Sequence, residues 1–415
     1  MTGLSSAFRS QVASLFAGNL RASLPVVAIG VASSIMFTLI PVFIIEVLGE
    51  RNLWIGGYFT AVTLTSIPIT LLLGRLADRT AHKKMLGLIT TAWVTAGCVL
   101  FLFIDSIGWL VAVGIAFLSL FEALNAQIFA IGRSSAASEP EEIAVTTSMR
   151  TAYALGYVMG PMVGAALTAL LGIRPAMVSC AAFFAASALV FCVKTSGPRG
   201  TTAAGAGVRS DPLDRRARFA LLALCLTLTA PIVRSAFLVV LATSVLGIRL
   251  DQVLLILAIA PLAELFLIPI CGSLAIRWGP PRIVLAGCAA AVFEMGCLAL
   301  VTSLWQLALL QLVGAFVVAT VISVGMAMVQ GMFSGRTAFG TSAFLATRSV
   351  SSLLGNLGGG ALAGAYGLRW TFAGAAALAL IGTGAMVTRV LPPRTRPPDR
   401  DGDPSREGGK QHTSG

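Results

Sequence analysis

Apolar runs of about 20 residues recur along almost the whole of this 415-residue chain. A helix rises about 1.5 Å per residue, so each run is long enough to cross a hydrocarbon core roughly 30 Å thick. Because lipid offers no partners for backbone polar groups, such segments must be helical. Only 11% of the residues are charged and 57% are hydrophobic. The sequence therefore predicts an all-α integral membrane protein.

The apolar runs fall into two groups of six, separated by a polar segment. Residues 1–194 contain expected helices at about 22–48, 54–76, 85–104, 108–131, 148–171 and 174–194. Residues 219–391 contain expected helices at about 219–246, 250–276, 282–302, 305–330, 341–365 and 369–391. The polar residues 195–218 predict a cytoplasmic linker, and the polar residues 392–415 predict a disordered cytoplasmic tail.

The net charge of +12 is spread over short loops and the tail. A nucleic-acid-binding protein would gather its basic residues on one soluble face, so we expect no nucleic-acid partner. Lys and Arg are instead retained on the cytoplasmic side when membrane helices insert. With a cytoplasmic N-terminus, 22 of the 29 Lys and Arg residues fall in cytoplasmic segments. The sequence therefore predicts a multi-pass protein of the bacterial inner membrane with both termini in the cytoplasm.

The residue types that enzymes and metal sites need are scarce. Both histidines, His82 and His412, lie in polar segments, and the seven cysteines lie in apolar runs without a C-x-x-C pair. We therefore expect no metal site and no enzymatic activity. The sequence also lacks the G-x-x-x-x-G-K-[ST] loop that cradles nucleotide phosphates, so we expect no cofactor. A sensor is disfavoured because the linker and tail are too short for a folded domain.

One offset relates the two groups of helices. Adding 198 to the residue number carries Gly74–Arg79 onto Gly272–Arg277, and the same offset carries Arg150 onto Arg348. Agreement at two places without gaps favours an internal duplication. The second copy has Ile276 where the first has an acid, so the two loops are not equivalent.

Two motifs resemble those of a known transporter family. The turn between the second and third expected helices reads Gly74-Arg75-Leu76-Ala77-Asp78-Arg79 and is followed by Lys83-Lys84. The fifth expected helix contains Gly156-Tyr157-Val158-Met159-Gly160-Pro161-Met162-Val163-Gly164. Both motifs resemble the major facilitator superfamily. The resemblance implies twelve transmembrane helices in two pseudo-symmetric six-helix halves, which rock about a site near the membrane midplane. We expect a monomer.

A narrower resemblance is to the sugar efflux transporters of that superfamily. It is carried by segments in both halves: Trp54-Ile55-Gly56, Gln127-Ile128-Phe129-Ala130 before Arg133, Met149-Arg150, Gly160-Pro161, Glu264, Gln330 and Gly335-Arg336. The chain departs from it at Met36 and Glu122, where the family tends to have Gln and Asn. The resemblance implies proton-coupled efflux of sugars, glycosides or similar small polar molecules. Efflux of a drug or natural product is the alternative.

Two opposite charges lie at similar depth in neighbouring expected helices. Glu264 is about thirteen residues from the cytoplasmic end of the eighth helix, and Arg234 is about fifteen from the same end of the seventh. Burying a charged group in a membrane costs free energy, so each of the two residues is expected to have a structural or functional role. They could form a structural ion pair that locks two helices. Alternatively the pair faces the cavity, where a proton or the substrate competes for the carboxylate.

Other polar residues are candidates for binding and coupling. Glu122 lies near the midplane of the fourth helix without a partner in that helix. It suits proton coupling or substrate binding, although a buried, hydrogen-bonded acid is the alternative. Glu294 lies on the ninth helix, which the resemblance makes an outer scaffold helix, so we interpret it as structural. Gln127 and Tyr157 offer hydrogen bonds to a hydroxyl-rich ligand, or between helices.

Seven residues are expected to act in gating or conformational change: Gly74, Asp78, Arg79, Arg150, Gly160, Pro161 and Arg348. In the family, the Asp and basic residues of the charged turn hold the outward-open state, although here they could serve only to set topology. Gly74 would let helix backbones approach closely. Pro161 would bend the fifth helix because it removes a backbone donor. Arg150 and Arg348 are interpreted as matched gate residues or as caps of neighbouring helix ends.

Overall fold

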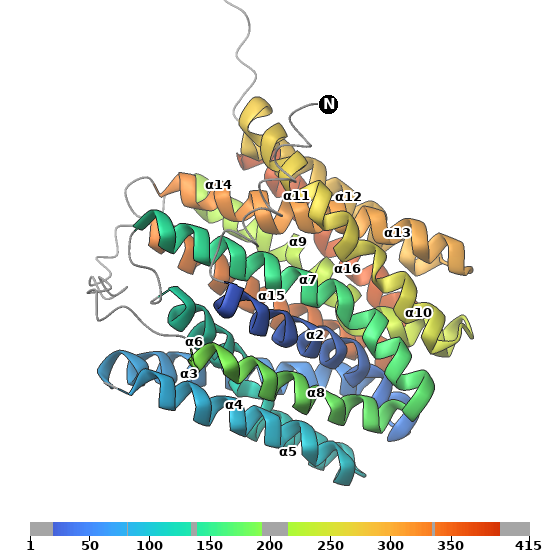
Figure 1. Ribbon diagram of the computed structural model, residues 1–415. Helices are drawn as coiled ribbons and strands as arrows, with labels where there is room; N and C mark the ends of the chain where they lie inside the picture. Colours follow the sequence, from blue (N-terminus) through green and yellow to red (C-terminus); the bar gives the residue numbers. More distant parts are fainter. Residues whose placement is uncertain (1–19, 81, 134–138, 193–214, 334–336, 391–415) are drawn as a thin grey trace, which may run out of the picture.

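The structure is a computed structural model that describes residues 20–80, 82–133, 139–192, 215–333 and 337–390. These residues are helical apart from short connections. Figure 1 shows the helices of the first half, in blue to green, grouped beside those of the second half, in yellow to red. The twelve predicted spans are all present, and eleven of them are long and apolar enough to cross a membrane. The predicted fold class is confirmed.

Six spans make up the first half, several of them built from two or three consecutive helices. In order they are α2 (Leu20–Val42) with η1 (Phe43–Val47), α3 (Leu53–Arg79), α4 (Lys83–Val99) with η2 (Leu100–Phe103), α5 (Ile107–Ala116) with η3 (Leu118–Leu120) and α6 (Phe121–Arg133), α7 (Glu139–Leu171), and α8 (Ile173–Ser187) with η4 (Ala188–Cys192).

Six more spans make up the second half. They are α9 (Arg215–Val240) with η5 (Leu241–Val245), α10 (Leu250–Leu257) with α11 (Ile259–Trp278), α12 (Pro280–Leu300), α13 (Leu304–Val317) with η6 (Val318–Val324) and α14 (Gly325–Met332), α15 (Thr337–Tyr366), and α16 (Leu368–Ala385) with η7 (Met386–Val390). The span that is not apolar enough to be counted is α15, which contains Arg348, Asn356 and many Gly and Ser residues. It packs against α3, α9 and α16.

The helix ends differ from the predicted ends at two informative places. Helix α7 begins at Glu139, well before the predicted residue 148. Its first four residues are Glu139-Pro140-Glu141-Glu142, and acids and proline both favour the start of a helix. Helix α3 continues through Gly74 to Arg79, and α4 begins at Lys83. The charged turn is therefore shorter than predicted, because most of the motif extends helix α3.

The two halves repeat an unusual local structure at the predicted offset. The first span of each half ends in a π-helical turn, at Phe43–Val47 and at Leu241–Val245, which are 198 residues apart. Each turn is followed by a glycine in a left-handed conformation, Gly49 with φ 67° and Gly247 with φ 65°. Only glycine adopts such angles without a steric penalty, so the same chain reversal is encoded twice.

Small residues let the helices of the first half approach closely. Helix α2 packs along α7, where the backbone of each helix occupies the space that a Cβ would need on Gly30 and Gly156. This arrangement is typical of membrane helices, which associate by close backbone packing because lipid is as apolar as their side chains.

The two halves meet mainly at one end of the bundle. There the first turns of α3 pack against the last turns of α15, and a Cβ on Gly56 would lie only 2.7 Å from the Cα of Gly360. Helix α10 packs against α7, and α2 packs against α9. The halves are therefore closed against each other at the end where α3 begins.

Arg174, at the start of α8, binds the end of the third span. Its guanidinium donates to the carbonyl oxygen of Leu102 at 3.1 Å and to the carboxylate of Asp105 at 3.1 Å. It also lies 5.5 Å from the ring centre of Phe43. The carbonyls at a helix end have no partner within their own helix, so this arginine satisfies a group that would otherwise be unpaired.

Arg369, at the start of α16, does the same in the second half. It donates to the carbonyl oxygens of Ala299 and Val301, both at 3.0 Å, where α12 ends. The two arginines therefore fasten the sixth span to the third, and the twelfth to the ninth.

We predict that Arg174→Ala and Arg369→Ala each lower the melting temperature of the detergent-solubilised protein by about 2–5 °C, because each loses charge-assisted hydrogen bonds worth ~1.5–3 kcal/mol. The control is Arg249→Ala, since Arg249 is 73% exposed and, among the described residues, pairs with Asp251, two residues away. A control variant as unstable as the other two would contradict the assigned role.

Candidate functional site

A polar cavity lies between the two halves of the bundle and encloses about 560 Å³. Residues of α2 and α7 line it from the first half, and residues of α9, α10, α11 and α13 line it from the second half. Its polar lining consists of Ser34, Thr38, Tyr157, Arg234, Ser235, Glu264 and Gln311. The hydroxyl, amide and charged groups can all hydrogen-bond a polar ligand.

Arg234 is the charged centre of this cavity. The residue lies on α9, and its Nε is 3.5 Å from Oε1 of Glu294 on α12. Its Nη1 donates a hydrogen bond of 3.4 Å to Oε1 of Gln311 on α13. The guanidinium is therefore held by two neighbouring helices while it also lines the cavity.

The sequence left open whether Arg234 and Glu264 form an ion pair, and in the structure they do not. Both side chains line the same cavity, but within the described ranges Glu264 has no basic group within 4.0 Å. The partner of Arg234 is Glu294 instead. Similar depth along two helices was the basis of the prediction, and depth does not determine how each helix is rotated about its axis.

Glu294 was predicted to be structural, and it is fully buried in the helix packing of the second half. Its side chain does not line the cavity, yet it reaches the cavity through its contact with Arg234. The space for this contact exists because Gly314 on α13 has no side chain, since a Cβ there would overlap both Arg234 and Glu294.

The structure brings four of the predicted residues together in the cavity: Tyr157, Pro161, Arg234 and Glu264. Gln127 lies outside it, buried in α6, and neither polar atom of its amide has a hydrogen-bond partner among the described residues. Glu122 also lies outside it, on an accessible face of α6.

The structure describes the surroundings of some of the predicted gating residues but not of others. Gly160 packs against Ser34 of α2, whose Oγ would lie 2.7 Å from a Cβ at that position, and Pro161 follows it in the interior of α7. The part of the chain that the structure describes makes no close approach at Gly74, since a Cβ there would meet none of its atoms within 4 Å. The side chain of Arg348 is exposed. The side chains of Asp78, Arg79 and Arg150 lie outside the described residues.

Sequence reasoning missed four polar residues of the cavity lining: Ser34, Thr38, Ser235 and Gln311. Ser and Thr are common in membrane helices, where they often bond their own backbone, as Ser235 does with the carbonyl oxygen of Pro231. Gln311 was detectable, because it is a single amide within the apolar segment Leu307–Val313.

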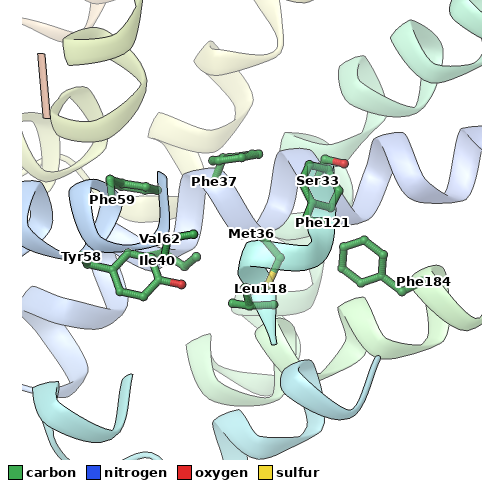
Figure 2. Close-up of a pocket in the computed structure, with 10 residues that line it drawn as sticks. All are labelled: Ser33, Met36, Phe37, Ile40, Tyr58, Phe59, Val62, Leu118, Phe121 and Phe184. Carbon is green, nitrogen blue, oxygen red and sulfur yellow. The ribbon is translucent and has the colours of Figure 1, made fainter. Parts of the chain in front are cut away.

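A second pocket, almost entirely apolar, lies within the first half and encloses about 420 Å³. Figure 2 shows the rings of Phe37, Phe59, Phe121 and Phe184 disposed around Met36. Its polar groups are the hydroxyls of Ser33 and Tyr58, and the Tyr58 hydroxyl has no hydrogen-bond partner among the described residues. Phe37 also lines the polar cavity, so the two spaces adjoin at its ring.

Comparison with known families and proteins gives a consistent result. The family described as the Major Facilitator Superfamily matches residues 22–230 and 219–414. A protein of Deinococcus radiodurans, provisionally named a sugar efflux transporter, is 26% identical over 90% of this chain and 98% of its own length. Sugar efflux transporter A of Dickeya chrysanthemi is 25% identical over 83% of this chain and 87% of its own.

Solved structures share the fold at low sequence identity. The nucleoside transporter NupG superposes with a TM-score of 0.78 at 14% identity, over 89% of this chain and 98% of its own. A bacterial homologue of the human lysosomal transporter Spinster, in an inward-facing conformation, gives a TM-score of 0.71 at 14% identity, over 91% of this chain and 96% of its own.

We predict that Arg234→Met destabilises the protein by about 3–5 kcal/mol, because it leaves Glu294 buried without a partner. The double variant Arg234→Met/Glu294→Met should recover most of this loss, since two apolar side chains replace two buried charges. Unfolding in detergent, followed by tryptophan fluorescence, measures both. A double variant no more stable than Arg234→Met alone would contradict the assigned ion pair.

Proposed function

The chain belongs to the Major Facilitator Superfamily and is a secondary transporter, not an enzyme, and we propose that it exports sugars, glycosides or similar small polar molecules in exchange for protons. The polar cavity between the halves carries the proposal. It combines hydroxyl, amide, guanidinium and carboxylate groups in a volume of about 560 Å³. Such groups match a ligand rich in hydroxyls, and the names of two relatives point to sugar efflux.

The cavity becomes accessible to the two sides of the membrane in turn as the halves rock. The halves are closed at the end where α3 begins, through the close approach of Gly56 to Gly360. With both termini in the cytoplasm, as the distribution of Lys and Arg favours, this end faces outward. In this conformation the cavity is open toward the cytoplasm of the bacterial cell. Substrate therefore enters it from the cytoplasmic side of the inner membrane. We propose that the protein works as a monomer.

In this proposal Glu264 carries the proton, because its carboxylate lines the cavity without an ion-pair partner among the described residues. Arg234, Tyr157 and the cavity hydroxyls hydrogen-bond the substrate. Glu122 is a second carboxylate, which exchanges a proton as the charge of Arg348 on the opposite half moves toward or away from it. Gln127 bonds substrate near Glu122, since both polar atoms of its amide lack a partner among the described residues.

The gating residues act at the ends of the moving helices. Gly160 and Pro161 keep α7 close to α2 and break its hydrogen-bond ladder beside the cavity. Gly74, Asp78, Arg79, Arg150 and Arg348 are proposed to form contacts between the halves at the cytoplasmic end in the alternate, outward-open state.

A second candidate function, efflux of an apolar drug or natural product, is favoured by the pocket of Figure 2. Its phenylalanine rings provide the apolar surface that sugars do not need. Competition in one assay separates the two candidates. If labelled mono- and disaccharides are exported and lipophilic dyes do not compete, the protein is a sugar exporter. Dye export without sugar export would support the second candidate and contradict the first.

We predict that the wild-type protein in proteoliposomes moves sugar against its gradient when a pH gradient is imposed. Glu264→Gln should abolish this accumulation but retain sugar exchange at equilibrium, because the exchange step needs no net proton movement. Glu46→Gln is the matched control, since Glu46 lies in η1, away from the cavity. A Glu264→Gln protein that still accumulates sugar would exclude Glu264 as the proton carrier.

We also predict that Asp78→Asn reduces transport severalfold more than Ile276→Ala, since only the first-half motif retains the acid that could bridge helices in the outward-open state. Initial rates of export at equal protein density measure the difference. Equal effects would leave the charged turn with a role in topology alone.

A further inference from the structure

We propose that Glu294 is a positioning residue for proton coupling: by binding the guanidinium of Arg234, it keeps that charge from neutralising Glu264. This inference rests on the proposed function, because it assumes that Glu264 carries the transported proton. It assigns a role in transport to an acid on α12, a helix that does not line the polar cavity.

The first support is the geometry of the ion pair. The side chain of Glu294 is 1% exposed and that of Arg234 is 11% exposed, so the pair is shielded from solvent on the side of the acid. Helices α9 and α12 pack against each other, and Nε of Arg234 lies 3.5 Å from Oε1 of Glu294. Gln311 binds Nη1 from α13. Two contacts therefore hold the guanidinium, one from α12 and one from α13.

The second support is the space that the fold reserves for this pair. Helix α13 contributes Gly314 at the contact, and a Cβ there would lie 2.7 Å from Cζ of Arg234 and would also overlap the Glu294 carboxylate. Not every glycine of these helices is needed for packing. A Cβ on Gly296, in the same helix as Glu294, would have no neighbour within 4 Å among the described residues. The absence of a side chain at Gly314, in contrast, leaves the space that the ion pair occupies.

The third support is the balance of charge around the cavity. From the described helices that pack here, α9 contributes Arg234, α11 contributes Glu264, α12 contributes Glu294, and α13 contributes the neutral Gln311. The titratable group facing the cavity from α7 is Tyr157. Arg348 of α15 is exposed and forms no ion pair within 4.0 Å with either acid among the described residues. Of the two acids, only Glu294 lies within 4.0 Å of Arg234, so Glu264 is the acid left without an ion-pair partner.

This distribution of charge explains how substrate movement could be coupled to proton movement. A carboxylate inside the membrane is costly unless it is paired or protonated. With Arg234 held by Glu294, Glu264 becomes neutral only by taking up a proton, and the halves rearrange around the neutral form. If Glu294 lost its charge, Arg234 could turn to Glu264 and neutralise it directly. The carrier would then change conformation without the proton.

A purely structural lock makes a different prediction. Loss of a lock weakens every step of transport together, because the helices pack less well. Loss of the positioning role reduces proton movement more than substrate movement. The ratio of protons to substrate is therefore the readout that separates the two roles.

The experiment uses the full-length protein in proteoliposomes that contain a pH-sensitive dye. It measures, in the same preparation, proton movement driven by a gradient of labelled sugar and sugar exchange at equilibrium. For Glu294→Gln we expect the ratio of protons moved to sugar exchanged to fall by about tenfold. A nearby opposite charge changes the protonation equilibrium of an acid by about this factor or more. Gly314→Ala should give the same fall, because it separates the pair while keeping both charges. Gly296→Ala is the matched control and should keep the wild-type ratio.

The outcomes are distinguishable. A fall in the ratio for Glu294→Gln and Gly314→Ala, with the control unchanged, supports the proposal. Wild-type ratios in both variants, while Glu264→Gln is uncoupled, would overturn the positioning role and leave the proposed function intact. Equal losses of proton movement and exchange in folded protein would also overturn it, in favour of a structural lock. A wild-type protein that moves sugar without protons would overturn both proposals.

Discussion

The free-energy cost of placing charge inside a membrane is the constraint on which the rest of this structure depends. An ionisable side chain near the bilayer centre costs at least about 2.5–3.5 kcal/mol, so each one must be paired, protonated or in contact with water. Arg234 meets this requirement through Glu294 and Gln311. The position of Glu264, beside the same guanidinium but outside its ion pair, then defines the cavity as a site with one unbalanced acid.

The same constraint explains where the fold uses glycine and arginine. Without a hydrophobic force between helices in lipid, close packing has to come from small residues, as at Gly56 and Gly360 between the halves and at Gly314 beside the ion pair. Where helix ends leave carbonyls without partners, Arg174 and Arg369 supply donors at corresponding places in the two halves.

The sequence was sufficient to predict the twelve spans, because a run of apolar residues determines a membrane helix almost by itself. It also singled out Arg234 and Glu264, whose side chains line one cavity in the structure. It did not identify the partner of Arg234, since depth in the membrane follows from residue number, whereas the facing direction depends on how helices are rotated and packed. Glu294 was interpreted as structural because the family resemblance makes the ninth helix a scaffold helix. Its contact with Arg234 requires the gap at Gly314, which only the packed structure reveals.

The central claim is that Glu294 stays ionised against Arg234 while Glu264 takes up and releases the proton. Infrared difference spectroscopy of the protein in lipid, recorded as the pH is lowered, detects the C=O stretch of a carboxyl group as it becomes protonated. The account predicts that this band is present in the wild-type protein, loses the contribution of Glu264 in Glu264→Gln while that of Glu122 remains, and keeps both contributions in Glu294→Gln. A band that persists in Glu264→Gln but disappears in Glu294→Gln would contradict the account, because Glu294 would then be the group that exchanges the proton.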